Sequence, residues 1–196
     1  MPDALMSELD AINSMLGAIG EAPISTLSGT LPVDVAIAQA ILTKTRRQVQ
    51  SKGWHFNTEK DVQSSLDGSS NVILPTNALE VELTYPDAAL DVVQRGTKLY
   101  DRRNHTYVFA TAPKLNITYL LEWAELPEQA RAYIALRSAR VFQAQTVGAQ
   151  ELDGYTARDE AMALADLEAA DANSANYNIL RSSPEMARLY RYRRPF

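Results

Sequence analysis

Two amphipathic stretches near the N-terminus, separated by a loop that contains glycine and proline, constrain the fold of this chain most strongly. In the first stretch the apolar residues recur at spacings of three and four, which places them on one face of a helix. They are Leu5, Leu9, Ile12, Leu16 and Ile19. Ser7 is a candidate N-cap, Gly20 suits the left-handed position after a helix, and Pro23 prevents the helix from resuming.

The second stretch opens after Pro32 and carries an apolar seam of its own. The seam residues are Val35, Ala38, Leu42, Thr45 and Val49. Gly53 ends this helix, and Trp54 and Phe56 then alternate with polar residues at the two-residue period of a strand. We therefore expect four structural anchors, at the loop and at the turn from helix to sheet: Pro23, Gly53, Trp54 and Phe56.

Strand-like periodicity dominates residues 54–123 and predicts a mostly antiparallel sheet. A half-buried strand is expected at 79–84, two turn-linked hairpins between 91 and 110, and an alternating strand at 115–123. The segment 61–71 is rich in serine and glycine and is typical of a loop.

Helical periodicity returns after Pro127. The expected stripe of the third helix consists of Ala132, Ala135, Leu136, Ala139 and Phe142, with Ile134 and Val141 beside it. In a fourth helix, from about 155 to 172, the aligned residues are Ala157, Ala161 and Leu164, with Met162, Ala165 and Ala169 alongside.

The order of these segments predicts an α+β fold. In it, a helical bundle formed from the N- and C-terminal halves, residues 5–53 and 127–180, flanks an antiparallel β subdomain at 54–123. Residues 1–180 are expected to form a single domain, followed by a tail at 181–196.

Composition excludes several classes of protein. The chain has no cysteine, so disulfides and thiolate metal sites are ruled out. It has no run of about 18 apolar residues, so we expect no membrane insertion. Its first residues lack the basic and apolar regions of a secretory signal. Of the net charge of −5, residues 181–196 contribute +4, so the other 180 residues carry −9, which disfavours nucleic-acid binding by the body.

The basic tail combines arginines with large apolar side chains, a pattern typical of a segment that docks on a partner. Its candidate interface residues are Arg188, Tyr190, Arg191, Tyr192, Arg193, Arg194 and Phe196. Nucleic-acid binding is the competing interpretation, since arginine contacts phosphates and tyrosine stacks on bases. We favour protein docking, because the acidic body offers an electrostatic partner.

No pattern of catalytic, metal-binding or cofactor-binding residues stands out. His55 and His105 have no partner at metal-ligand spacing, and no glycine-rich phosphate loop is present. Glu122 and Glu125 flank Trp123, and a glutamate against an indole can act as a general acid. A peptidoglycan-degrading hydrolase is therefore the alternative function, although the strand pattern turns Glu122 away from the indole.

Several blocks of the chain carry a family resemblance. They are the GEAPISTL loop, the following DVA helix with its QSKGWHFN exit, KLYDRRNHTYVF, LPEQARAYIALRSARVFQAQTVGA, and the stretch from ELDG to YNIL. In this order they resemble tail tubular protein A, the head-to-tail adaptor family of short-tailed phages. The resemblance covers most of residues 5–180.

The resemblance implies a non-enzymatic virion protein without cofactors. It implies a closed ring of about twelve copies that joins the portal protein to the tail nozzle, tail tubular protein B. It also implies that viral DNA passes through the ring without sequence recognition, and that assembly takes place in the bacterial host cytoplasm. The acidic residues around the fourth helix would then line the channel or meet a basic neighbour. They are Glu151, Asp153, Asp159, Glu160, Asp166, Glu168 and Asp171.

Overall fold

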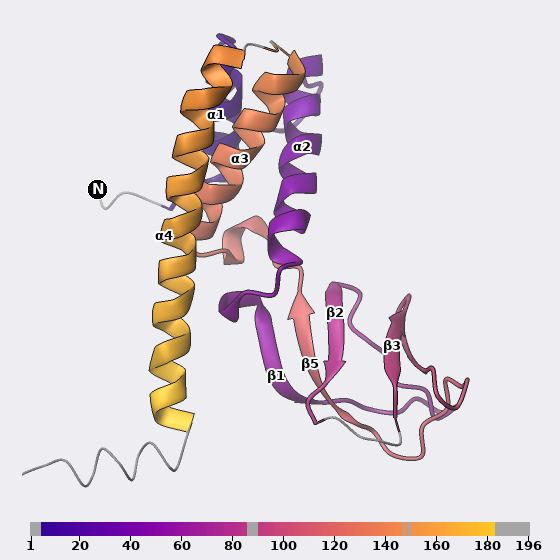
Figure 1. Ribbon diagram of the computed structural model, residues 1–196. Helices are drawn as coiled ribbons and strands as arrows, with labels where there is room; N and C mark the ends of the chain where they lie inside the picture. The colour runs from indigo at the N-terminus through magenta and orange to yellow at the C-terminus, as the bar shows by residue number, and fades with distance from the viewer. Residues whose placement is uncertain (1–4, 86–89, 147, 149, 183–196) are drawn as a thin grey trace, which may run out of the picture. The chain divides into compact units, whose positions relative to one another are not determined.

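The computed structural model describes residues 5–85, 90–146, 148 and 150–182, with only the backbone described for 150–156 and 176–182. The chain divides into two compact units. The helical unit comprises residues 1–42 and 127–196, and the β unit comprises 43–126. The fold is α+β, as the sequence predicts, and Figure 1 shows the helices and strands of each unit. None of the helices described has the length and apolar character needed to span a membrane.

Helix α1 (Glu8–Ala18) begins at the predicted N-cap. The Ser7 hydroxyl accepts a hydrogen bond from the Asp10 backbone N–H, and the Asp10 carboxylate accepts one from the Ser7 N–H, which forms a capping box. The Ser7 hydroxyl and then the Ser7 backbone N–H donate to the Asp10 carboxylate, and these two hydrogen bonds hold the pKa of Asp10 below its usual range. Leu5 is 56% exposed because it precedes the cap, so its predicted place on the buried face is wrong.

The loop after α1 is held by a side chain that the sequence pattern did not single out. The Asn13 amide donates to the Ile24 carbonyl at 3.0 Å and accepts from the Ile24 N–H at 2.9 Å. This pair of bonds fixes the residue that follows Pro23 against α1. Gly20 has a φ of +83°, the left-handed conformation expected after the helix.

Helix α2 (Val33–Gln50) begins in the helical unit and ends in the β unit. Its predicted seam is confirmed, since every member is at least 97% buried: Val35, Ala38, Leu42, Thr45 and Val49. The opposite side of α2 is exposed along its length.

Helix α3 (Glu128–Thr146) packs against both α1 and α4 (Gln150–Ser182). The predicted stripe of α3 is partly wrong, because Leu136 is 40% exposed whereas Ile134 and Ser138 are buried. The buried face is rotated because it also takes in polar side chains. Arg131, for example, is buried and donates to the Met6 carbonyl at 2.9 Å.

Helix α4 is longer than predicted and buries a different face. Ala163 and Leu167 are its buried residues among those whose side chains are described, whereas Met162 is 61% exposed and Ala161 is exposed too. The error arises because α4 carries alanines on all of its faces, so that the spacing of apolar residues does not distinguish one face from another.

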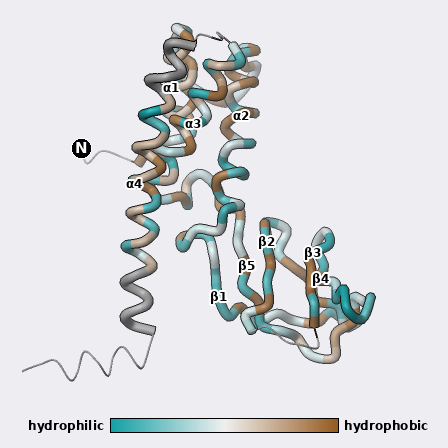
Figure 2. The backbone as a smooth tube through the Cα atoms, viewed as in Figure 1, coloured by the Kyte–Doolittle hydropathy of each residue, from teal (hydrophilic) through white to brown (hydrophobic). Residues whose placement is uncertain are grey.

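The β unit contains a three-stranded antiparallel sheet in the order β1-β5-β2 and a β3-β4 hairpin. The strands are β1 (Thr58–Gln63), β2 (Ala78–Leu83), β3 (Val92–Arg95), β4 (Lys98–Asp101) and β5 (Lys114–Tyr119). Alternation of apolar and polar residues along β2 is visible in Figure 2. One core joins the sheet to the hairpin: Val72, Leu74, Val81, Leu99, Phe109, Leu115 and Ile117.

Two predicted strand limits are wrong. Trp54 does not start a strand, because it caps the 3-10 turn η1 (His55–Asn57), and β1 begins only at Thr58. β5 stops at Tyr119 and does not reach residue 123, since the turn η2 (Trp123–Glu125) follows it. Both differences arise where side-chain amides take over the backbone hydrogen bonds that a strand would otherwise need.

Candidate interaction surfaces

The exit of α2 is built around Trp54. This side chain is 8% exposed, and its indole N–H donates to the Val49 carbonyl at 2.7 Å, one turn back along the helix. Its ring stacks on Phe56 with centroids 6.4 Å apart. Gly53 has a φ of +71°, which favours glycine, and a Cβ there would lie 3.4 Å from the Thr118 hydroxyl. The anchoring role of these residues stays a prediction for mutagenesis.

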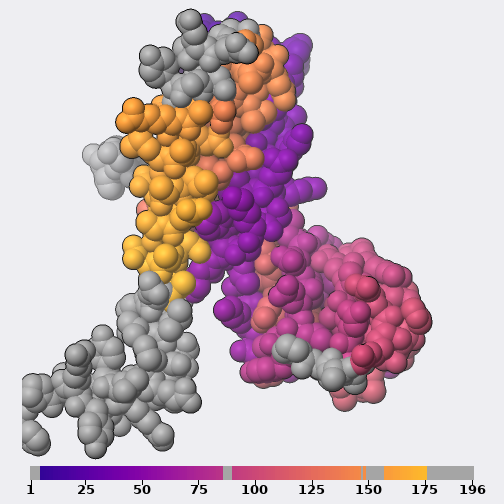
Figure 3. Space-filling view, in the orientation of Figure 1, coloured from indigo at the N-terminus to yellow at the C-terminus, as the bar shows by residue number. Residues whose placement is uncertain are grey.

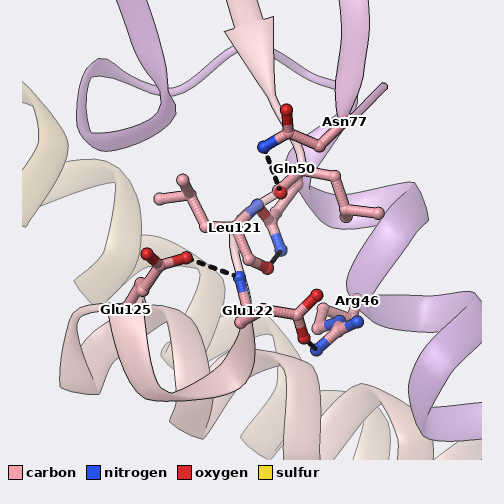
Figure 4. Close-up of polar contacts among 7 residues, drawn as sticks. Arg46, Gln50, Asn77, Leu121, Glu122 and Glu125 are labelled. Atoms are coloured by element: carbon pink, nitrogen blue, oxygen red, sulfur yellow. Dashed lines mark hydrogen bonds and ion pairs between the residues drawn. The ribbon is translucent and has the colours of Figure 1, made fainter. Parts of the chain in front are cut away.

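Two buried amides, which sequence reasoning missed, tie α2 to the end of β5. The Gln50 side chain donates to the Leu121 carbonyl at 3.1 Å and accepts from the Leu121 N–H at 2.7 Å (Figure 4). Asn57 donates to the carbonyls of Gln50 and Tyr119 at 2.9 and 2.8 Å. Periodicity offers no signal for such residues, because their partners at the end of β5 lie more than sixty positions away in the sequence.

Glu122 and Glu125, the candidate carboxylates of a hydrolase, each have a structural partner. The Arg46 side chain is only 15% exposed, and its guanidinium donates to the Glu122 carboxylate at 2.9 Å. The Glu125 carboxylate accepts from the Glu122 backbone N–H at 2.9 Å (Figure 4). The Glu122 carboxylate therefore neutralises the largely buried Arg46 cation, and the Glu125 carboxylate holds the start of η2.

Neither histidine takes part in a metal cluster. His105 lies exposed in the turn after β4, with a φ of +51°, and His55 is exposed in η1. Among the residues that the structure describes, no three histidine, aspartate or glutamate side chains are grouped closely enough to hold a metal ion.

The β3-β4 hairpin presents a patch of aromatic and basic side chains. The Arg95 guanidinium lies 3.6 Å from the centre of the Tyr100 ring, which meets Tyr107 edge-on at 4.8 Å. Ile73 and Val108 are also exposed. Ile73 forms a β-bridge with Lys98 of β4, and Val108 forms one with Asn71. Arginine and tyrosine are common at protein interfaces, so this patch is a candidate contact surface of the β unit.

The acidic run on α4 has two kinds of members. Glu160 is 15% exposed and accepts from Arg137 and Arg140 of α3 at 3.2 and 3.0 Å. With Val141 and Ala144 these residues line a shallow pocket of about 330 Å³. Asp159, Asp166 and Glu168 are exposed instead. Thus Glu160 holds α4 on α3, whereas Asp159, Asp166 and Glu168 face outward.

The tail candidates lie outside the described residues. They are Arg188, Tyr190, Arg191, Tyr192, Arg193, Arg194 and Phe196.

The chain is similar to known proteins over most of its length, including parts of both units. Residues 9–177 match the family model described as tail tubular protein. A 131-residue stretch is 34% identical to tail tubular protein A of Klebsiella phage KP34 and covers 66% of this chain and 68% of that protein.

Proposed function

This chain belongs to the tail tubular protein family, a structural component of phage tails, and on that premise we propose that it forms the adaptor ring between portal and tail nozzle. About twelve copies would close the ring through heterologous contacts between neighbours. One face would meet the portal protein and the opposite face the nozzle protein, tail tubular protein B. Assembly in the host cytoplasm then places the ring in the virion tail.

The observation that carries this proposal is that the family match runs through both units, from residue 9 to residue 177. A match of that extent concerns the whole architecture, in contrast to one shared motif. The two candidate catalytic carboxylates, Glu122 and Glu125, have structural partners in this architecture. The proposed role is therefore non-enzymatic and needs no cofactor.

Charge supports a conduit for DNA. The first 42 residues contain no lysine or arginine, and the ten basic residues of the β unit are balanced by ten acidic ones. The negative charge of the body therefore belongs to the helical unit. Acidic side chains on a channel wall repel the DNA phosphates, which would keep the polymer sliding without sequence recognition.

The experiment is to mix the purified protein with its portal and to record particle size and symmetry. We expect the free protein to sediment as a monomer or weak oligomer, and the mixture to show a ring of defined rotational symmetry on one end of the portal by electron microscopy. Stable rings of the isolated protein at low micromolar concentration would contradict the requirement for a template. A mixture without any joint particle would contradict the adaptor role.

A further inference from the structure

Helix α2 is apolar on two sides, and only one of them is buried among the residues that the structure describes. Opposite the buried seam, Val33 is 73% exposed and Ile37 is 41% exposed. Ala36 and Ala40 are exposed between them. These four residues follow the i, i+3, i+4, i+7 spacing of a single helix face. We call them, with exposed Lys44 and Arg47 further along the same face, the outer face of α2.

Helix α4 has a comparable side that is exposed among the described residues. Met162 is 61% exposed, and Ala165, Ala169 and Ala172 lie exposed on the same side. In the space-filling view, α4 forms a long strip of visible surface on the helical unit (Figure 3). Helix α4 has 33 residues and is therefore longer than α3, the 19-residue helix on which it packs. We call this side, with exposed Arg158, Asp159 and Asp166, the outer face of α4.

The two outer faces are complementary in shape and in charge. Alanines on α4 allow a neighbouring helix to approach closely, and the larger Val33 and Ile37 of α2 supply side chains to fill the space above them. The α2 face carries the cations Lys44 and Arg47, whereas the α4 face carries the carboxylates Asp159 and Asp166 and a single cation, Arg158. Pairing α2 with α2 would instead place like charges together.

From this complementarity we propose that the outer face of α2 docks on the outer face of α4 of a second copy of the chain. The two faces are different surfaces, and they belong to helices that stand at opposite edges of the helical unit in Figure 1, so the contact is heterologous and repeats from copy to copy. Such a contact generates a ring when the rotation closes. The inference rests on the proposed ring and names the surfaces that hold neighbours together.

The first test places a charge in the apolar part of the contact. Ile37→Glu introduces a carboxylate on the outer face of α2, and Leu136→Glu is the matched control, since Leu136 is 40% exposed but lies on α3. On the portal, Ile37→Glu should raise the concentration for half-maximal ring assembly at least about tenfold, with Leu136→Glu close to the parent. Both isolated variants should melt near the parent, because each change is on an exposed surface.

The second test reverses the charges. Lys44→Glu with Arg47→Glu should weaken ring assembly, and adding Asp159→Lys with Asp166→Lys in the same chain should restore it. Rings that form equally well with Ile37→Glu or with the α2 charge reversal alone would overturn the proposed contact while leaving the adaptor role intact. If the parent itself forms no ring on the portal, the proposed function fails.

Discussion

Replacing Trp54 with alanine tests the joint between α2 and the sheet. The indole is 8% exposed and donates to the Val49 carbonyl at 2.7 Å, so truncation removes both buried apolar area and a hydrogen bond. Truncation of a buried tryptophan typically costs about 3–5 kcal/mol. About 1 kcal/mol of that belongs to the lost hydrogen bond. For a chain of this size, each kcal/mol lowers Tm by roughly 2–4 °C, so we expect a fall of about 6–20 °C.

The assay exploits the second tryptophan. Trp123 lies in the same β unit and is 6% exposed, so its fluorescence reports unfolding of that unit even when Trp54 is absent. Thermal melts followed by this emission should be compared with melts followed by circular dichroism, which reports both units.

Two variants serve as controls. Trp54→Phe keeps an aromatic ring but loses the hydrogen-bond donor, and it should cost about 1–2 kcal/mol. Tyr85→Ala truncates an aromatic side chain that is 67% exposed, and it should change stability by less than about 0.5 kcal/mol. If Trp54→Ala melts within a few degrees of the parent, Trp54 is not an anchor and the reasoning is wrong.

Three further predictions address acid stability, catalysis and the tail. Hydrogen bonds from Asn71, first its backbone N–H and then its amide, lower the pKa of Asp67, so this carboxylate stabilises the fold above its unfolded pKa of about 4 and loses that effect as the pH falls through the folded value. Asp67→Ala should therefore lower Tm at pH 7, by a margin that shrinks in melts recorded below about pH 4; a constant margin would contradict this account. In a peptidoglycan zymogram we expect no clearing by the parent, and clearing that Glu122→Gln or Glu125→Gln abolishes would establish a hydrolase. Deleting residues 182–196 should leave Tm of the isolated protein nearly unchanged, but weaken assembly on the portal, more so at high salt; unchanged assembly would refute tail docking.

The helices near the N-terminus are predictable because their apolar residues stand out from polar neighbours. Ser7, Gly20 and the buried seam of α2 all behave as local capping and periodicity rules require. The same rules misplace the buried faces of α3 and α4. Alanine is apolar on every side of α4, and α3 buries Arg131 and Ser138, which periodicity counts as polar surface.

The strand limits and the partners of the candidate residues depend on long-range contacts. Asn57 and Gln50 accept hydrogen bonds from the backbone N–H groups of Trp54 and Leu121, although nothing in the local pattern distinguishes these two amides from exposed ones. Likewise, the sequence near Glu122 gives no sign of a basic partner, and only the fold shows its ion pair with Arg46, 76 positions earlier. Local sequence rules therefore predict helices and strands, whereas hydrogen bonds between side chains and distant segments can be identified only in the folded chain.

The most direct test of the adaptor role is a cryo-EM reconstruction of the intact virion that resolves the junction between portal and nozzle. Our account predicts a continuous collar of repeating subunits around the DNA axis, each showing the four helices and the small sheets of this chain. Density for the chain elsewhere in the tail, or a portal in direct contact with the nozzle and no collar between them, would contradict it.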